Sequence, residues 1–244
     1  MGTYVNPGTT NFEKDINDDF YVDKSMLIKV LNTKINRRNC YCCVSRPRRF
    51  GKTMAANMIA AYYSKGCDSH EAFSDLKISE DPSFEENINK YTVIQLDMND
   101  VVTNKEDNSV TEYINKEIVS ELRKVYPSVL LADDTSLSKA IKEIYSSTGD
   151  RFVFIIDEYD VIIRDQQYSS ELSGYLSFLV SLFKNSIISP AIALAYLTGI
   201  MPIIKEKTQS KLNNFNEYTM LNAKDMAPFM GFTEDEVKGL ALKV

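Results

Sequence analysis

The chain has 244 residues, of which 44% are hydrophobic and 25% charged, an ordinary globular composition with enough apolar side chains for one full core. Its formal net charge of −6 argues against a protein that coats nucleic acid by general electrostatic attraction. The longest apolar run, AIALAYL, is strand-sized and far shorter than the ~20 residues that a membrane helix needs. We therefore expect no membrane span and a cytoplasmic location.

The N-terminal region is the least patterned part of the chain. Residues 1–18 are polar and include Pro7 and Gly8, so we expect a leader or loop. The next stretch, DFYVDKSMLIKVL at residues 19–31, predicts a short amphipathic helix that packs on the core. Further on, residues 67–90 are expected to form a loop-rich insertion.

The stretch from Cys40 to Thr53 has the order of a phosphate-binding loop. A strand-like apolar run is followed by a basic loop, and Gly51-Lys52-Thr53 then opens an Ala- and Met-rich helix. In G-x-x-x-x-G-K-[ST] loops, backbone N–H groups wrap the phosphates, the Lys reaches the β- and γ-phosphates, and the Ser or Thr hydroxyl binds Mg²⁺. Arg46 stands where the first glycine of that pattern would be. Seven cations and no acid lie between Lys34 and Lys52, which focuses positive charge on this region.

A second motif, FVFIIDE, complements the loop. Five apolar residues predict a strand buried on both faces, and Asp157 and Glu158 follow them. An Asp at such a strand end holds Mg²⁺ in P-loop enzymes, and a Glu after it activates the attacking water. This pair favours the glutamate-using branch, in which a further strand lies between the loop strand and the acidic strand. AIALAYL supplies that strand, and Thr198 lies at its end. Thr198 is placed to sense the γ-phosphate or to orient the attacking water; the alternative is a plain backbone hydrogen bond.

The alternation of strands and helices predicts an α/β fold: a three-layer P-loop NTPase with a mainly parallel five-stranded sheet. The helical patterns cover residues 110–126, 136–147 and 172–183, and a short fifth strand is expected near residues 217–221. We divide the chain into an N-terminal segment (1–36), a P-loop core (37–221) and the start of a truncated helical region (222–244). A capping box, Thr233 and Glu236, opens the last helix.

Taken together, FYVDKS, SRPRRFGKT, FIIDEYD, LTGIMPI, LNNFNEYTM and MGFTEDEV resemble, in this order, the bacterial AAA-ATPase-like domain family. The resemblance covers about residues 11–240. It implies that an arginine-rich loop without the first glycine is usual, that Tyr21, Asp23 and Lys24 lie near the nucleotide, and that a PD-(D/E)XK nuclease-like domain often follows. Helix packing is the alternative explanation for the residues of the N-terminal segment.

These arguments predict a site for ATP and Mg²⁺. The expected catalytic residues are Lys52, Glu158 and Thr198, and the expected metal-binding residues are Thr53 and Asp157. The expected nucleotide-binding residues are Tyr21, Asp23, Arg46, Pro47, Arg48, Arg49, Phe50, Gly51, Lys52, Thr53 and Met54.

Our leading hypothesis for function is Mg²⁺-dependent ATP binding with slow hydrolysis, in a conformational switch or regulator. The last arginine of the sequence is Arg164, whereas ring-forming motors typically place an arginine finger later, so a ring motor is less favoured. One alternative is a non-hydrolytic nucleotide-binding module for a protein partner or a downstream domain; a lesser one is a P-loop kinase. A nucleic-acid partner has only the basic loop in its favour.

Overall fold

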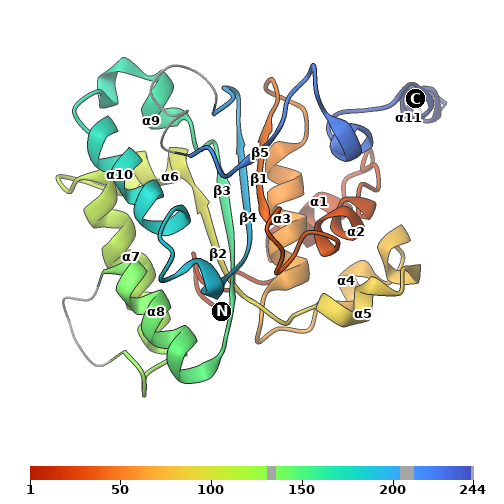
Figure 1. The fold of residues 1–244 in the computed structure, drawn as a ribbon. Coiled ribbons are helices and arrows are strands. Elements are labelled where there is room, and N and C mark those ends of the chain that lie inside the picture. The colour runs from red at the N-terminus through yellow and green to blue at the C-terminus, as the bar shows by residue number, and fades with distance from the viewer. Residues whose placement is uncertain (131–135, 204–211, 243–244) are drawn as a thin grey trace.

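The computed structural model describes residues 1–130, 136–203 and 212–242, and these form a three-layer α/β fold around one five-stranded parallel sheet (Figure 1). The strand order is β2-β3-β4-β1-β5. The strands span Tyr41–Ser45 (β1), Thr92–Asp97 (β2), Phe152–Asp157 (β3), Ile192–Gly199 (β4) and Asn216–Tyr218 (β5). The predicted fold class is confirmed, including the placement of β4 between the loop strand β1 and the acidic strand β3.

The central strands are buried along their whole length, as their unbroken apolar runs require. The register pairs Val44 of β1 with Thr198 of β4, and Ile156 of β3 with Leu197 of β4. Because all strands are parallel, their carboxyl ends meet at one edge of the sheet. Asp157, Thr198 and the loop after Ser45 therefore emerge together, at the place where open α/β sheets bind ligands.

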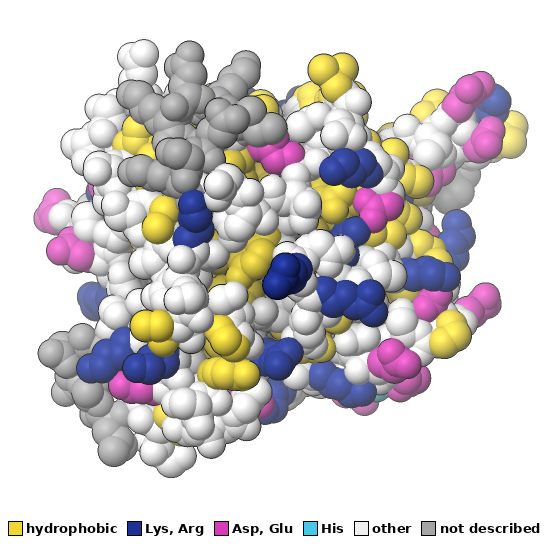
Figure 2. All heavy atoms as spheres, in the orientation of Figure 1, with side chains coloured by type: hydrophobic (Ala, Val, Ile, Leu, Met, Phe, Trp, Pro, Cys, Tyr) yellow, Lys and Arg dark blue, Asp and Glu magenta, His cyan; other side chains and the backbone are white. Residues whose placement is uncertain are grey.

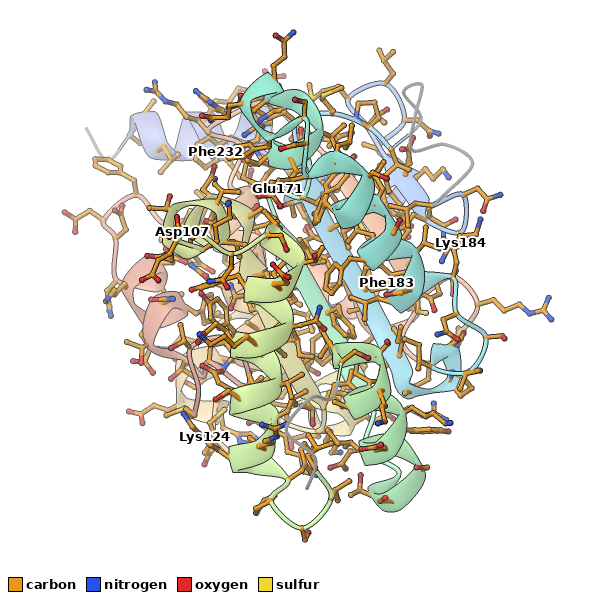
Figure 3. The ribbon with its side chains drawn as sticks, turned by 90° about the vertical axis from the view of Figure 1, so that its left-hand side faces the viewer. Asp107, Lys124, Glu171, Phe183, Lys184 and Phe232 are labelled. Carbon is orange, nitrogen blue, oxygen red and sulfur yellow. The ribbon has the colours of Figure 1, made fainter. Side chains whose placement is uncertain are left out.

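Helices cover both faces of the sheet (Figure 1). One face carries α7, α8 and α10, which lie side by side in Figure 3. Phe183 of α10 makes edge-on aromatic contacts with Tyr41, Phe154 and Phe215, which anchors that helix to the sheet and to the segment before β5. The other face carries α3, with α1 and α2 beyond it. The bounds are Val110–Val125 (α7), Leu137–Thr148 (α8), Leu172–Phe183 (α10), Lys52–Tyr63 (α3), Thr10–Ile16 (α1) and Met26–Asn32 (α2).

Shorter elements connect these layers. The α-helical ones are His70–Phe73 (α4), Ser83–Asn87 (α5), Met98–Asn104 (α6), Val161–Arg164 (α9) and Glu234–Ala241 (α11). The 3₁₀ turns are Lys77–Glu80 (η1), Gln166–Tyr168 (η2), Ser189–Ala191 (η3) and Lys224–Phe229 (η4). The predicted capping box of the last helix is present, with Thr233 and Glu236 bonded reciprocally.

Two segments are packed more closely than their sequences predict, and for the first of them the prediction was wrong. Residues 1–18 are not a loop: Val5 is fully buried and bridges to Ile94 of β2, and Phe12 of α1 stacks on Phe73. Residues 67–90 are loop-rich as predicted, but they are also packed, because Phe73, Ile78 and Phe84 place short helical turns against the core. In both segments single apolar residues, too widely spaced to form a periodic pattern, supply the burial.

Across residues 1–130, 136–203 and 212–242, no helix is long and apolar enough to cross a membrane.

Candidate functional site

The loop between β1 and α3 is held by its buried first residue. Arg46 is 3% exposed, and its Nη1 donates to the carbonyls of Ser45 and Tyr218, both at 2.9 Å. Burial lowers the pKa of this guanidinium. The side chain therefore fastens the loop to β5. Pro47, Arg48 and Arg49 are exposed after it.

Two left-handed residues shape the end of this loop. Arg49 has φ +68° and Gly51 has φ +74°, a region that glycine adopts far more readily than other residues. Gly51 is the N-cap of α3, so the free N–H groups of the first turn face the loop. A helix N-terminus of this kind favours anions.

Lys52 is buried at the start of α3, although it carries a charge. Its Nζ donates to the carbonyls of Arg46 at 3.3 Å and Pro47 at 3.2 Å, and lies 3.3 Å from Glu158 Oε1. A buried ammonium needs such partners because it has lost its water. The loop thus surrounds the cation that the sequence assigns to phosphate.

Asp157 is the centre of the polar cluster at the carboxyl edge. It is 2% exposed; its Oδ2 accepts from the Thr53 hydroxyl at 2.6 Å, and its Oδ1 accepts from the Thr198 hydroxyl and from the Glu158 N–H at 3.0 Å. Residues from α3, β3 and β4 thereby meet at one carboxylate, although Thr53 is 104 positions and Thr198 is 41 positions from Asp157 in the sequence.

Glu158 adopts a strained backbone conformation. Its φ of +51° is in the left-handed region, where a residue with a Cβ is strained by roughly 1 kcal/mol or more. This turn directs the carboxylate between two cations: Oε1 lies 3.3 Å from Lys52 Nζ and Oε2 lies 2.8 Å from Arg164 Nη1. Arg164, at the end of α9, did not emerge from the sequence as a site residue.

The two residues after Glu158 make hydrogen bonds to the loop that follows β4, at Ile200 and Met201. The Asp160 side chain is fully buried, its Oδ2 accepts from the Ile200 and Met201 N–H groups, and burial raises its pKa. Tyr159 donates from its hydroxyl to the Met201 carbonyl at 2.6 Å. A Cβ on Gly199 would come within 2.6 Å of Asp160 Oδ1, so only glycine fits beside this carboxylate.

Next to the loop lies a cavity of about 290 Å³, which α3, the N-terminal segment and the C-terminal segment enclose. Its walls are mostly apolar, and it reaches the loop through Arg49, Phe50 and Gly51. Lys24 ties the two outer walls together, because its Nζ donates to the Pro228 carbonyl at 2.7 Å and pairs with Glu236 at 2.6 Å. The remaining lining residues are Asp18, Phe20, Tyr21, Val22, Met54, Ala55, Met58, Phe229, Gly231 and Phe232.

The structure brings together most of the predicted site residues, in two groups. Lys52, Thr53, Asp157, Glu158 and Thr198 form the polar cluster, whereas Tyr21, Arg49, Phe50, Gly51 and Met54 line the cavity beside it.

The structure places the side chains of three other features outside these two groups. Asp23 does not line the cavity: one oxygen accepts from the Ser25 N–H and the other from the Lys77 N–H, so it fixes the start of α2. The side chain of Arg46 is structural, as described above. Lys34 and the arginines at 37 and 38 precede β1, so they lie at the amino edge of the sheet, away from the loop. The run of positive charge in the sequence is thus divided between opposite ends of one strand.

Charges of both signs are mixed on the molecular surface. On the face shown in Figure 2, Lys and Arg side chains are interrupted by acidic and apolar ones and form no continuous basic patch. That face therefore adds nothing to the case for a nucleic-acid partner.

The donor atoms of the polar cluster suit Mg²⁺. The Thr53 hydroxyl and the Asp157 carboxylate are hard oxygen ligands, and Mg²⁺ commonly takes only one or two protein ligands beside phosphate and water. Within the described residues, no three His, Cys, Asp or Glu side chains are grouped so that they could hold a metal by themselves. This arrangement fits an ion that arrives with a phosphate ligand.

The strand order and this polar edge define a P-loop NTPase-like α/β protein. A family model described as predicted AAA-ATPase matches residues 6–208, and the chain belongs to that family. The chain is also 21% identical over 224 residues to a protein of Azotobacter chroococcum mcd 1 named "Uncharacterized protein in vnfD 5'region". That match covers 90% of this chain and 41% of the relative, so the chain spans about two fifths of the relative's length.

Proposed function

We propose that this chain binds ATP with Mg²⁺ and hydrolyses it slowly, and that the change of bound nucleotide acts as a conformational switch. The observation that carries the proposal is the single cluster formed by Lys52, Thr53, Asp157, Glu158 and Thr198 beside a helix N-terminus. Membership of the predicted AAA-ATPase family supports it at the level of nucleotide binding.

Each group in the cluster has a role that its chemistry allows. Lys52 and the first turn of α3 bind the phosphates, while Thr53 and Asp157 hold Mg²⁺. Bound Mg²⁺ would neutralise charge on the phosphates. Glu158 accepts a proton from the attacking water, and Thr198 orients Asp157 through its hydroxyl bond.

The cavity beside the loop is proposed to hold the nucleoside. It opens onto Gly51, so a ligand whose phosphates lie at the start of α3 would reach it, and its walls include the aromatic rings of Phe20, Tyr21 and Phe232. Apolar and aromatic walls of this kind suit a purine base.

A calorimetric titration with ATP, with and without Mg²⁺, and a phosphate-release assay test this proposal. Lys52→Ala should abolish ATP binding, and Glu158→Gln should retain binding without turnover. Lys124→Ala is the matched control, because Lys124 is exposed near the far end of α7 (Figure 3). Full turnover in Glu158→Gln, or unchanged binding in Lys52→Ala, would contradict the assignments.

A non-hydrolytic nucleotide-binding module is the second candidate function. The observation in its favour is that each carboxylate oxygen of Glu158 lies beside a cation, so an attacking water would have to share its oxygen with Lys52 or Arg164. Single-turnover measurements separate the two functions: tight ATP binding with no phosphate release over hours would favour the module.

A further inference from the structure

The Glu158 carboxylate lies between two cations, Lys52 of the phosphate-binding loop and Arg164 of α9. Lys52 Nζ lies 3.3 Å from Oε1, and Arg164 Nη1 lies 2.8 Å from Oε2. The Glu158 side chain is only 14% exposed, so neither contact is a loose surface pair. Removing one partner of a pair this sheltered leaves a poorly solvated charge behind.

A bound triphosphate would compete for one of these cations. If Lys52 binds phosphate, as proposed above, its contact with Glu158 weakens, since phosphate oxygens carry more negative charge than one carboxylate. Arg164 lies on α9, outside the phosphate loop, and keeps its contact. It is then the cation that determines where the Glu158 carboxylate points.

Arg164 is itself held to the loop after β4. Its Nη1 lies 3.6 Å from Asp160 Oδ1, and the other oxygen of Asp160 accepts from the Ile200 N–H at 3.2 Å and the Met201 N–H at 2.9 Å. The Arg164 side chain is 22% exposed and Asp160 is fully buried, so the link is sheltered. Through it, Glu158 is connected to the segment that follows Thr198.

We propose that Arg164 is a positioning residue that holds the Glu158 carboxylate at the phosphate site once Lys52 engages the nucleotide, through the contacts Glu158–Arg164–Asp160. This inference rests on the proposed function. It assigns Arg164 no contact with ATP, so it separates turnover from binding. Arg164 faces both carboxylates with one nitrogen, Nη1, in ion pairs that lack hydrogen-bond geometry. Lysine at this position would keep the charge, but on a more flexible stem that holds it less firmly between the two carboxylates.

The test compares wild type, Arg164→Ala, Arg164→Lys and Arg164→Gln by calorimetric ATP affinity and by single-turnover phosphate release at saturating ATP and Mg²⁺. We expect Arg164→Ala to slow release by about 10- to 100-fold, as misplacement of a catalytic group does, with its ATP affinity unchanged. Arg164→Gln should resemble it, and Arg164→Lys should be intermediate. Arg38→Ala, an exposed arginine before β1, is the control and should match wild type.

A second measurement needs no turnover. Arg164→Ala should lower the Tm of the nucleotide-free protein, and the loss should shrink in a Glu158→Gln background, because Arg164 then has one charged partner fewer. If Arg164→Ala does not fold, the same comparison of Tm values can be made with Arg164→Gln or Arg164→Lys.

Several outcomes would overturn the inference. A release rate in Arg164→Ala equal to or above that of wild type would exclude a positioning role. Parallel losses of rate and affinity would indicate a structural role, and an equal loss of Tm in both backgrounds would show that Arg164 does not act through Glu158. If the wild-type protein binds ATP but releases no phosphate, the proposed hydrolysis is wrong, and the positioning role of Arg164 is rejected together with it. The wild-type measurement by itself identifies that case.

Discussion

The Thr53 hydroxyl donates to Asp157 Oδ2 at 2.6 Å, which joins the first turn of α3 to the end of β3. Thr53 is exposed whereas Asp157 is buried, so the bond lies where the polar cluster opens to solvent. The two oxygens are thus preorganised as a pair, and a cation between them would replace one hydrogen bond by two metal contacts.

This pairing gives a prediction about metal dependence. Thr53→Ala should weaken ATP binding in the presence of Mg²⁺ by about tenfold, the usual cost of one bond to a charged group, and should change binding without Mg²⁺ much less. Thr53→Ser keeps the hydroxyl and is the matched control. Titrations with and without chelator measure the difference, and equal losses under both conditions would remove Thr53 from the metal site.

The cavity can be tested separately from the phosphate loop. Met54→Trp would fill part of the 290 Å³ cavity and should weaken ATP binding by about tenfold or more, while leaving the affinity for inorganic triphosphate intact. Ile187→Trp, at a residue 62% exposed, controls for the added ring. A loss of triphosphate affinity in Met54→Trp would show that the substitution disturbs α3 itself.

Gly199 and Gly174 should respond to alanine with opposite signs. A Cβ at Gly199 would meet Asp160 Oδ1 at 2.6 Å and the Tyr159 ring at 2.8 Å, so Gly199→Ala should destabilise the fold by about 1–3 kcal/mol. A Cβ added at Gly174 in α10 would meet no atom within 4 Å beyond the helix's own backbone, so Gly174→Ala should stabilise the helix by about 0.5–1 kcal/mol. Urea unfolding measures both, and a neutral Gly199→Ala would mean that the β4 loop can shift.

The carboxyl group of Asp81 should make the free energy of unfolding depend on pH in the acid range. Lys29, at 2.8 Å, and then the Ser83 hydroxyl and N–H lower the pKa of this carboxyl to about 2. Because the pKa is lower in the folded than in the unfolded chain, the stabilisation is fully present above the unfolded value of 3.8 and is lost as the pH falls toward 2. Lys29 is 54% exposed, so we expect no more than about 1 kcal/mol.

The stability difference between wild type and Asp81→Asn should therefore be constant from neutral pH to about 4.5 and shrink below that. Asp19→Asn, at an exposed carboxylate, is the control. A difference that grows as the pH falls would reverse the sign of the argument.

The sheet and the polar cluster could be predicted because each depends on a continuous signal. Apolar runs mark β1, β3 and β4, and charged or hydroxyl residues at their ends must share one edge once the strands are parallel. The packing of Val5 and Phe12 could not be predicted, since isolated apolar residues in a polar stretch have no period.

The role of Arg164 was hidden for a different reason. Its separation from Asp160 fits a helix turn, but Glu158 lies outside α9 and adopts a left-handed conformation that its residue type does not favour, so no helical spacing indicates their contact. Asp23 and Arg46 show the converse case. Both occur in motifs that indicate ligand binding, yet their side-chain bonds go to backbone groups nearby.

The bond from Lys24 to Glu236 joins the two outer walls of the cavity, which come from regions about two hundred residues apart in the sequence. A nucleoside bound there would be linked thermodynamically to the docking of α11. The lining residues from this end of the chain, Phe229, Gly231 and Phe232, come just before α11. If displacement of α11 draws them away, nucleotide affinity falls, and by reciprocity bound nucleotide opposes that displacement with the same free energy. Occupancy of the cavity would then stabilise the ion pair between the N-terminal segment and α11.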